Sequence, residues 1–142
     1  MKDLHELTDL QLSIMHEIWR RDRATVTDVH EALIDATGLA KKTVGTMMAR
    51  LEKQGFLTHF VEGREYVYEA AVTRQEVRRA KVHNVLDGLF GGSLPSMVSH
   101  ALEAGEVAAN DLERVRQMLN EWEQRELAED VAGSTSKGGS RE

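Results

Sequence analysis

Residues 40–55 read Ala40-Lys41-Lys42-Thr43-Val44-Gly45-Thr46-Met47-Met48-Ala49-Arg50-Leu51-Glu52-Lys53-Gln54-Gly55. At helical spacing, one arc of about 100°, the width of a stripe that faces a core, holds only apolar side chains. These are Ala40, Val44, Met47, Met48 and Leu51. The opposite arc holds cationic, hydroxylated or very small side chains and no acid: Lys42, Thr43, Thr46, Ala49, Arg50 and Lys53. Such an arc suits a helix that approaches phosphates closely. We predict a recognition helix in the major groove of DNA, ending at Gly55; the alternative is an amphipathic helix with a solvated face.

The segments before this stretch favour the recognition helix. Residues 7–21 have helical apolar spacing, with Thr8 and Asp9 as starting caps, and Trp19 is expected to close the core. After a short β-prone run at residues 24–26, Thr27 is a good N-cap for a second helix that reaches about Ala36. A tight turn containing glycine then leads into residues 40–55. Two helices joined in this way are typical of a helix-turn-helix.

The segment after Gly55 predicts a β-hairpin. Residues 56–61 and 66–70 are β-rich, and the turn between them contains glycine. A hairpin directly after a recognition helix is the wing of a winged helix. Arg64 lies at its tip, where a wing reaches the DNA backbone, although a solvated turn residue is an equally good reading of Arg64 alone. Together with Lys41, it extends the predicted set of DNA contacts.

Residues 73–129 predict three further helices. Thr73 and Glu76 match a capping box, Pro95 fits the first turn of the next helix, and a third helix begins near Asn110 and ends near Glu129. So small a helical unit does not bury all its apolar stripes alone, and we expect it to form a homodimer. The alternative is that it packs back onto the wing domain. The dimer contacts are expected from Val85, Leu86, Leu89, Leu112, Val115, Leu119 and Trp122.

The fold class that follows is mainly α with a small β wing. We expect a winged helix-turn-helix DNA-binding domain at residues 1–72, a three-helix dimerisation domain at residues 73–129, and a disordered tail at residues 130–142.

Composition sets limits on the function. The chain has no cysteine, which excludes disulfides and thiolate metal sites, and no run long and apolar enough for a membrane span. Its start does not match a signal peptide, so we expect a cytoplasmic protein. The net charge is −6, but residues 41–64 carry five Lys or Arg against two acids. A local basic patch binds phosphates because screening limits each charge to roughly 8–10 Å.

These residues together resemble the penicillinase repressor family of bacterial transcription factors (the BlaI/MecI/CopY group) over roughly residues 5–129. The similar stretches are Leu7-Thr8-Asp9-Leu10-Gln11 in the first helix, Lys42-Thr43-Val44 with Lys53-Gln54-Gly55 in the recognition helix, and Gly91-Gly92-Ser93 in the dimerisation half. The resemblance implies a homodimeric winged-helix repressor that binds a palindromic operator on double-stranded DNA. It implies DNA contacts at Lys42, Thr43, Thr46 and Arg50, which are the residues that the helical arc selects.

The chain departs from the family in three places. Gly45 replaces a larger residue that faces the groove in many members, which suggests a different operator sequence. The cysteine cluster of the copper-responsive branch is missing. In the β-lactam branch, a pathway that starts from a membrane-sensor protease cuts an Asn–Phe bond, and His100-Ala101 stands at the corresponding place here. We therefore expect release by proteolysis within residues 89–102 at another bond; a ligand or another signal is the alternative.

An enzyme is the main alternative from another class. The pairs His5-Glu6, His16-Glu17 and His30-Glu31 each begin a zinc-protease motif, but the second histidine is absent each time. No phosphate-binding loop or nucleophile motif is present. We expect no catalytic site, no metal and no cofactor. A winged helix that contacts only proteins and a ligand- or metal-responsive regulator stay open as alternatives.

Overall fold

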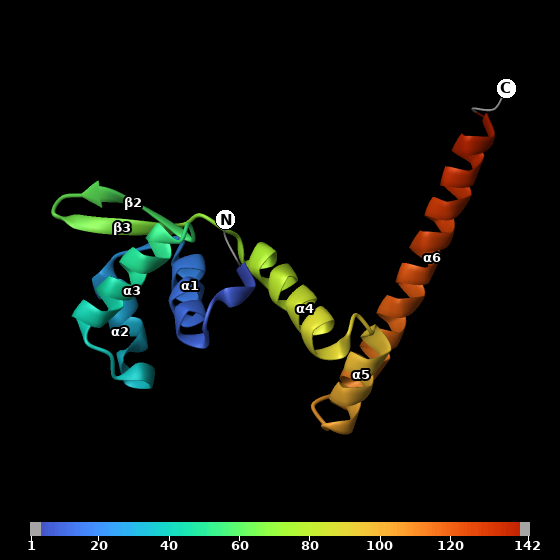
Figure 1. The fold of residues 1–142 in the computed structure, drawn as a ribbon, viewed down its shortest axis with the longest axis horizontal. Coiled ribbons are helices and arrows are strands. Elements are labelled where there is room, and N and C mark those ends of the chain that lie inside the picture. Colours follow the sequence, from blue (N-terminus) through green and yellow to red (C-terminus); the bar gives the residue numbers. More distant parts are fainter. Residues whose placement is uncertain (1–3, 140–142) are drawn as a thin grey trace. The chain divides into compact units, whose positions relative to one another are not determined.

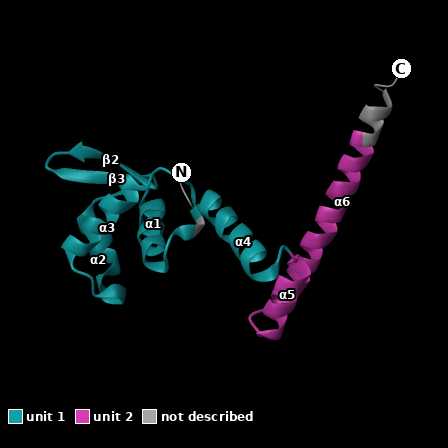
Figure 2. Cartoon of the chain, viewed as in Figure 1, with its two compact units in different colours: residues 1–92 teal, residues 93–142 magenta. Residues whose placement is uncertain are grey.

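The computed structural model describes residues 4–139, and the chain forms two compact units that divide between Gly92 and Ser93 (Figure 2). The first unit contains a short 3-10 helix, four α-helices and a small sheet (Figure 1). Its elements are η1 (Leu4–Glu6), α1 (Asp9–Arg21), β1 (Arg23–Ala24), α2 (Val26–Thr37), α3 (Lys41–Lys53), β2 (Leu57–Glu62), β3 (Glu65–Ala70) and α4 (Arg74–Phe90). This order is that of a winged helix-turn-helix, as predicted.

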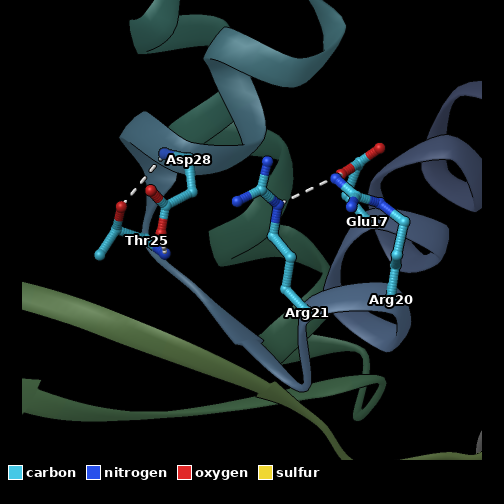
Figure 3. Close-up of polar contacts among 5 residues, drawn as sticks. All are labelled: Glu17, Arg20, Arg21, Thr25 and Asp28. Carbon is cyan, nitrogen blue, oxygen red and sulfur yellow. Dashed lines mark hydrogen bonds and ion pairs between the residues drawn. The ribbon is translucent and has the colours of Figure 1, made fainter.

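Reciprocal caps fix the starts of α1 and α2. Thr8 Oγ1 accepts from the Gln11 N–H, and the Gln11 side chain accepts from the Thr8 N–H. Thr25 and Asp28 make the same pair of bonds at the start of α2 (Figure 3). The predicted cap at Thr27 is therefore wrong by two residues. The reason is that Thr25 has an acid three residues later and Thr27 does not.

A cluster of oppositely charged side chains lies in the last part of α1, just before the turn to α2. Glu17 on α1 lies 2.7 Å from the Arg20 guanidinium and 3.3 Å from that of Arg21 (Figure 3). Hydrogen bonding to Arg20, supported by Arg21, holds the pKa of the Glu17 carboxyl below its usual range. Both arginines lie in the last turn of α1, where cations also complement the helix dipole.

The sheet has the antiparallel order β1-β3-β2. The predicted hairpin is confirmed, with Phe60 opposite Val67 and Glu62 opposite Glu65 beside the turn. The β-prone run after α1 supplies a third, two-residue strand that pairs Ala24 with Tyr68. The sheet thereby ties the wing to the α1–α2 turn.

One hydrophobic core joins the helices of unit 1 to the sheet. The fully buried side chains include Ile14, Met15, Ile18, Val29, Val44, Met48, Leu51 and Leu57. Trp19 packs against this core and donates from Nε1 to the Val72 carbonyl at 2.9 Å, in line with its predicted closing role. Leu10, one of the apolar residues at helical spacing in residues 7–21, is only partly buried.

Helix α4 belongs to the first unit, which corrects the predicted boundary after Val72. Val77 is 2% exposed and lies in the core. Lys81 Nζ donates to the Leu7 carbonyl at 2.8 Å, and the Arg74 guanidinium lies 5.6 Å from the Trp19 ring centroid. A boundary at Val72 would cut these contacts, and the compact unit continues to Gly92.

The second unit contains α5 (Leu94–Glu103) and α6 (Ala109–Gly139). Pro95 lies in the first turn of α5, as predicted. The expected helix end near Glu129 and the disorder expected for residues 130–139 are corrected, because α6 runs on to Gly139. The last three residues of the predicted tail, 140–142, lie outside the described residues. Once a helix exists, each added residue gains a backbone hydrogen bond without a new nucleation cost, and a single glycine such as Gly133 costs only about 1 kcal/mol.

Candidate nucleic-acid interface

The recognition helix α3 has one anchored and one exposed side. Val44, Met48 and Leu51 are at most 1% exposed and fix its rotation against the core. The predicted outer arc is exposed throughout: Lys42, Thr43, Thr46, Ala49, Arg50 and Lys53. Of the other residues predicted for the inner arc, Met47 is partly buried and Ala40, the N-cap of α3, is exposed, so the predicted division holds within the helix but not at its start. Whether the outer arc contacts DNA stays a prediction.

The start of α3 is positively charged. Gly38 ends α2 in the left-handed region, at φ 68°, and its N–H donates to the Ile34 carbonyl. Only two residues then separate Gly38 from Lys41, so the turn is tight. Lys41 and Lys42 occupy the first turn of α3 without any acid, and they add to the positive end of the helix dipole. This end of α3 attracts anions.

A surface hollow of about 450 Å³ lies between the start of α1 and the outer arc of α3; we name it the helix groove. Its lining consists of Thr8, Gln11, Lys42, Thr43, Thr46, Met47 and Arg50. Two of these side chains are cationic and none is acidic, so the groove favours a polyanion. The sequence does not identify Thr8 and Gln11 as part of this surface, because a role in capping a helix does not indicate which groove a residue lines.

A second hollow, of about 280 Å³, lies between the starts of α2 and α3 and the wing; we name it the wing groove. It brings together two predicted DNA contacts from distant parts of the chain, Lys41 on α3 and Arg64 on the wing. Gly63 adopts φ 64° at the hairpin turn and so presents the exposed Arg64. Glu62 and Glu65 flank that turn and reduce the positive charge of the wing tip.

An aromatic and acidic cluster connects α3 with the wing. His59 Nδ1 on β2 lies 2.6 and 2.7 Å from the two carboxylate oxygens of Glu52 on α3. The His59 ring stacks on the Tyr66 ring with centroids 4.1 Å apart and an interplanar angle of 14°. Burial, together with the negative charge of Glu52 and the neighbouring Tyr66, raises the pKa of Tyr68. Sequence reasoning missed this cluster. Strand alternation, which puts Tyr66 and Tyr68 on one face, was the available signal.

Gly45 does not lie on the side of α3 that would face the DNA groove, contrary to what the resemblance implied. A Cβ at this position would lie 3.5 Å from Val26 Cγ1, so the glycine faces the start of α2. That distance is an ordinary van der Waals contact, and an alanine would fit. The suggested link between Gly45 and operator choice therefore has no direct geometric support.

The predicted dimer residues lie on two of the three C-terminal helices, α4 and α6. Val85, Leu86 and Leu89 are on α4 in the first unit, and Leu112, Val115, Leu119 and Trp122 are on α6 in the second. Leu86 is partly buried, and the others are 38–77% exposed. On α5, Leu94, Val98 and Leu102 are also about half exposed. Each helix thus carries an apolar face exposed within this single chain.

The predicted cleavage region begins at the end of α4 and continues through most of α5. Gly91 and Gly92, both exposed and with positive φ, connect the two helices. His100 is exposed and Ala101 is partly buried, and both lie in the last turns of α5. A protease that cuts at His100-Ala101 would have to unwind part of a helix, whereas the glycine pair is accessible without unwinding.

Among residues 4–139, no group of three His, Cys, Asp or Glu side chains could hold a metal ion. No helix in the described part of the chain is long and apolar enough to cross a membrane.

The chain matches the family model described as penicillinase repressor over residues 7–121. It is 30% identical to a penicillinase repressor of Bacillus licheniformis, over 88% of this chain and 98% of that protein. It is 31% identical to the transcriptional regulator BlaI of Mycobacterium tuberculosis (strain CDC 1551 / Oshkosh), over 87% and 89% of the two chains. A solution structure of the monomeric form of Bacillus licheniformis BlaI in complex with the blaP half-operator is 32% identical, covers 54% of this chain and 93% of that one, and has a TM-score of 0.46.

Proposed function

Because the chain belongs to the penicillinase repressor family, we propose that it is a transcriptional repressor that binds operator DNA through α3 and the wing. The observation that carries this proposal is the acid-free outer arc of α3, with a groove containing cations on each side. A helix in the major groove lies between two phosphate backbones. The wing groove offers Lys41 and Arg64 to one of those backbones, while the helix groove offers Lys42 and Arg50 on the side of the base edges. The protein acts where the DNA is, in the cytoplasm.

The side chains divide into two roles. Lys42, Thr43, Thr46 and Arg50 lie on the outer arc and contact base edges. Thr46 Oγ1 donates to the Lys42 carbonyl at 3.0 Å, which leaves its oxygen as an acceptor and its methyl group for apolar contact with thymine. Arg50 has the bidentate geometry that suits guanine. The remaining cations, Lys41, Lys53 and Arg64, contact phosphates.

The functional form is a homodimer on a palindromic operator. The exposed apolar faces of α5 and α6 support this, because a single chain leaves Leu119 and Trp122 more than half exposed. A second copy offers the same apolar surface and covers both faces at once. Joining two half-sites makes the second DNA contact effectively intramolecular and raises the affinity by orders of magnitude.

Repression ends when the chain is cut within residues 89–102. The exposed glycine pair between α4 and α5 supports this region, and the signal is a membrane-sensor protease pathway that responds to β-lactams. The cut separates the DNA-binding unit from α6 and from all or part of α5. Losing the dimer contacts then lowers operator occupancy without any change in α3.

The test is selection of bound sites from random duplex DNA, followed by affinity measurements over a range of salt concentrations. A palindromic consensus and an affinity that falls steeply with salt are expected, since each phosphate contact releases counterions. Lys42→Ala and Arg50→Ala should weaken binding, while Arg79→Ala, which removes an exposed charge on α4, serves as the matched control. No enrichment of any sequence and no salt-dependent binding would refute the proposal and favour a module that contacts only proteins.

A further inference from the structure

The wing groove contains groups suited to more than charge attraction. Besides Lys41 and Arg64, its lining includes the hydroxyl side chains of Thr27 and Tyr66. Glu65 also lines the groove, so its balance is two cations against one carboxylate. Cations combined with neutral hydroxyl donors are the usual partners of backbone phosphates.

Tyr66 is the unusual member of this set. It is a large aromatic residue, 52% exposed, on a strand whose next two residues are buried. Its ring stacks on His59, and its hydroxyl makes no hydrogen bond within the part of the chain that the structure describes. The ring is therefore held while the polar end stays available to a ligand.

The orientation of Tyr66 depends on α3. Glu52, on the recognition helix, bonds His59 through both carboxylate oxygens, and His59 in turn stacks on Tyr66. This arrangement links the wing to the helix through side chains from three elements. A donor that is positioned before binding loses less conformational entropy when its ligand arrives.

We propose that the wing groove binds one backbone phosphate of duplex DNA, with Lys41 and Arg64 supplying charge and Thr27 and Tyr66 donating hydrogen bonds. His59, held by Glu52, is a positioning residue for Tyr66. This inference rests on the proposed function and adds contacts to it. The phosphate belongs to DNA because the same groove is bounded by the first turn of α3, whose outer arc faces the bases.

The first experiment compares the full chain with its Tyr66→Phe variant, on a selected operator and on an unrelated duplex of equal length. The substitution keeps the ring and its stacking and removes only the hydroxyl. We expect the affinity for both duplexes to fall by about tenfold to hundredfold, because a lost hydrogen bond to a charged group affects all sequences alike. The salt dependence should stay unchanged, whereas Arg64→Ala should reduce its slope by about one.

Val61→Thr is the matched control. Val61 lies opposite Tyr66 in the hairpin register, is 61% exposed and does not line the groove, so the variant adds a wing hydroxyl elsewhere. It should bind DNA as the unaltered chain does. Circular dichroism of all variants checks that the wing is retained.

The second experiment replaces single phosphates of the operator with neutral methylphosphonates. At one phosphate position in each half-site, the replacement should weaken DNA binding by the unaltered chain. The same replacement should weaken binding by Tyr66→Phe distinctly less, because the two changes remove the same contact. His59→Phe keeps an aromatic stack but loses the bond to Glu52. His59→Phe should weaken DNA binding when it is the only substitution. In the Tyr66→Phe variant it should cause no further loss of affinity.

The outcomes separate this inference from the proposed function. If the unaltered chain binds the operator and Tyr66→Phe binds equally well, the phosphate site is refuted and the repressor proposal stands. Additive losses for His59→Phe and Tyr66→Phe would refute the positioning role. If inorganic phosphate at millimolar concentration binds in the wing groove but no duplex binds, the assignment of the phosphate to DNA fails. A chain that binds no duplex at all would refute both proposals.

Discussion

Ending the chain at Val72 rather than at Gly92 removes the whole of α4, and with it part of the packing of the DNA-binding unit. Three contacts disappear: the buried Val77 side chain, the Lys81 bond to the Leu7 carbonyl, and the Arg74 guanidinium over Trp19. Full burial of a valine contributes about 1.5–3 kcal/mol, a hydrogen bond from a charged group about 1.5–3 kcal/mol, and a partly exposed cation–π contact about 0.5–1 kcal/mol.

The fragment of residues 1–72 should therefore be less stable than the fragment of residues 1–92 by about 3.5–7 kcal/mol. Small domains are stable by only about 5–15 kcal/mol, so the shorter fragment lies near the limit of folding. Urea unfolding followed by circular dichroism measures the difference, with the slope of each transition checking for two-state behaviour.

A pair of valine substitutions on α4 controls for effects of truncation alone. Val77→Ala in the longer fragment should cost about 1–2 kcal/mol, while Val82→Ala, at a position that is 56% exposed on the same helix, should change stability by less than about 0.5 kcal/mol. Equal urea midpoints for the two fragments, or equal effects of the two valine substitutions, would show that α4 is not part of the first unit.

Four more outcomes are expected. Lys42→Ala and Arg50→Ala should each weaken operator binding by about 1–3 kcal/mol without a loss of thermal stability; equal affinity in titrations of a selected site would contradict the assignment of α3. Gly45→Ala should raise the free energy of unfolding by roughly 0.5–1 kcal/mol, because its Cβ meets Val26 at an ordinary contact distance; a lower melting temperature would contradict this. The folded pKa of Glu17 is lowered, so its stabilisation is present above the unfolded pKa and is lost as the pH falls through the acid range; Glu17→Gln should differ from the unaltered chain more at pH 7 than at pH 3 in thermal melts. Light scattering should give a dimer for the full chain and a monomer for residues 1–92, and a full-length monomer would contradict the dimer.

The sequence was sufficient to predict the local elements. The 3.6-residue period around Val44, Met48 and Leu51 fixes which arc of α3 is buried, and the exposed arc follows from it. The hairpin was predictable for the same kind of reason, because the turn residues lie between two β-rich runs. In both cases the signal lies within about fifteen residues of the element that it specifies.

Contacts between distant residues were not predictable in this way. Thr27 taken as a single residue is a good N-cap, but the start of α2 is decided by the reciprocal hydrogen bonds between Thr25 and Asp28. Val77 has the same apolar character as its exposed neighbour Val82, and nothing in the local pattern says that it packs against the core. The bond between His59 and Glu52 depends on how the hairpin packs on α3.

The position of α4 also bears on how repression would end. Because α4 is packed into the first unit through Val77 and Lys81, a cut in the exposed Gly91-Gly92 connection or later removes none of the core of that unit. The fragment left behind keeps α3, both grooves and the Glu52–His59 bond. What it lacks is α6 and all or part of α5, with their exposed apolar faces. Proteolysis in this region would therefore reduce the number of half-sites that the protein binds at once, while each half-site contact stays intact. A large loss of operator occupancy would then need no change in the recognition helix.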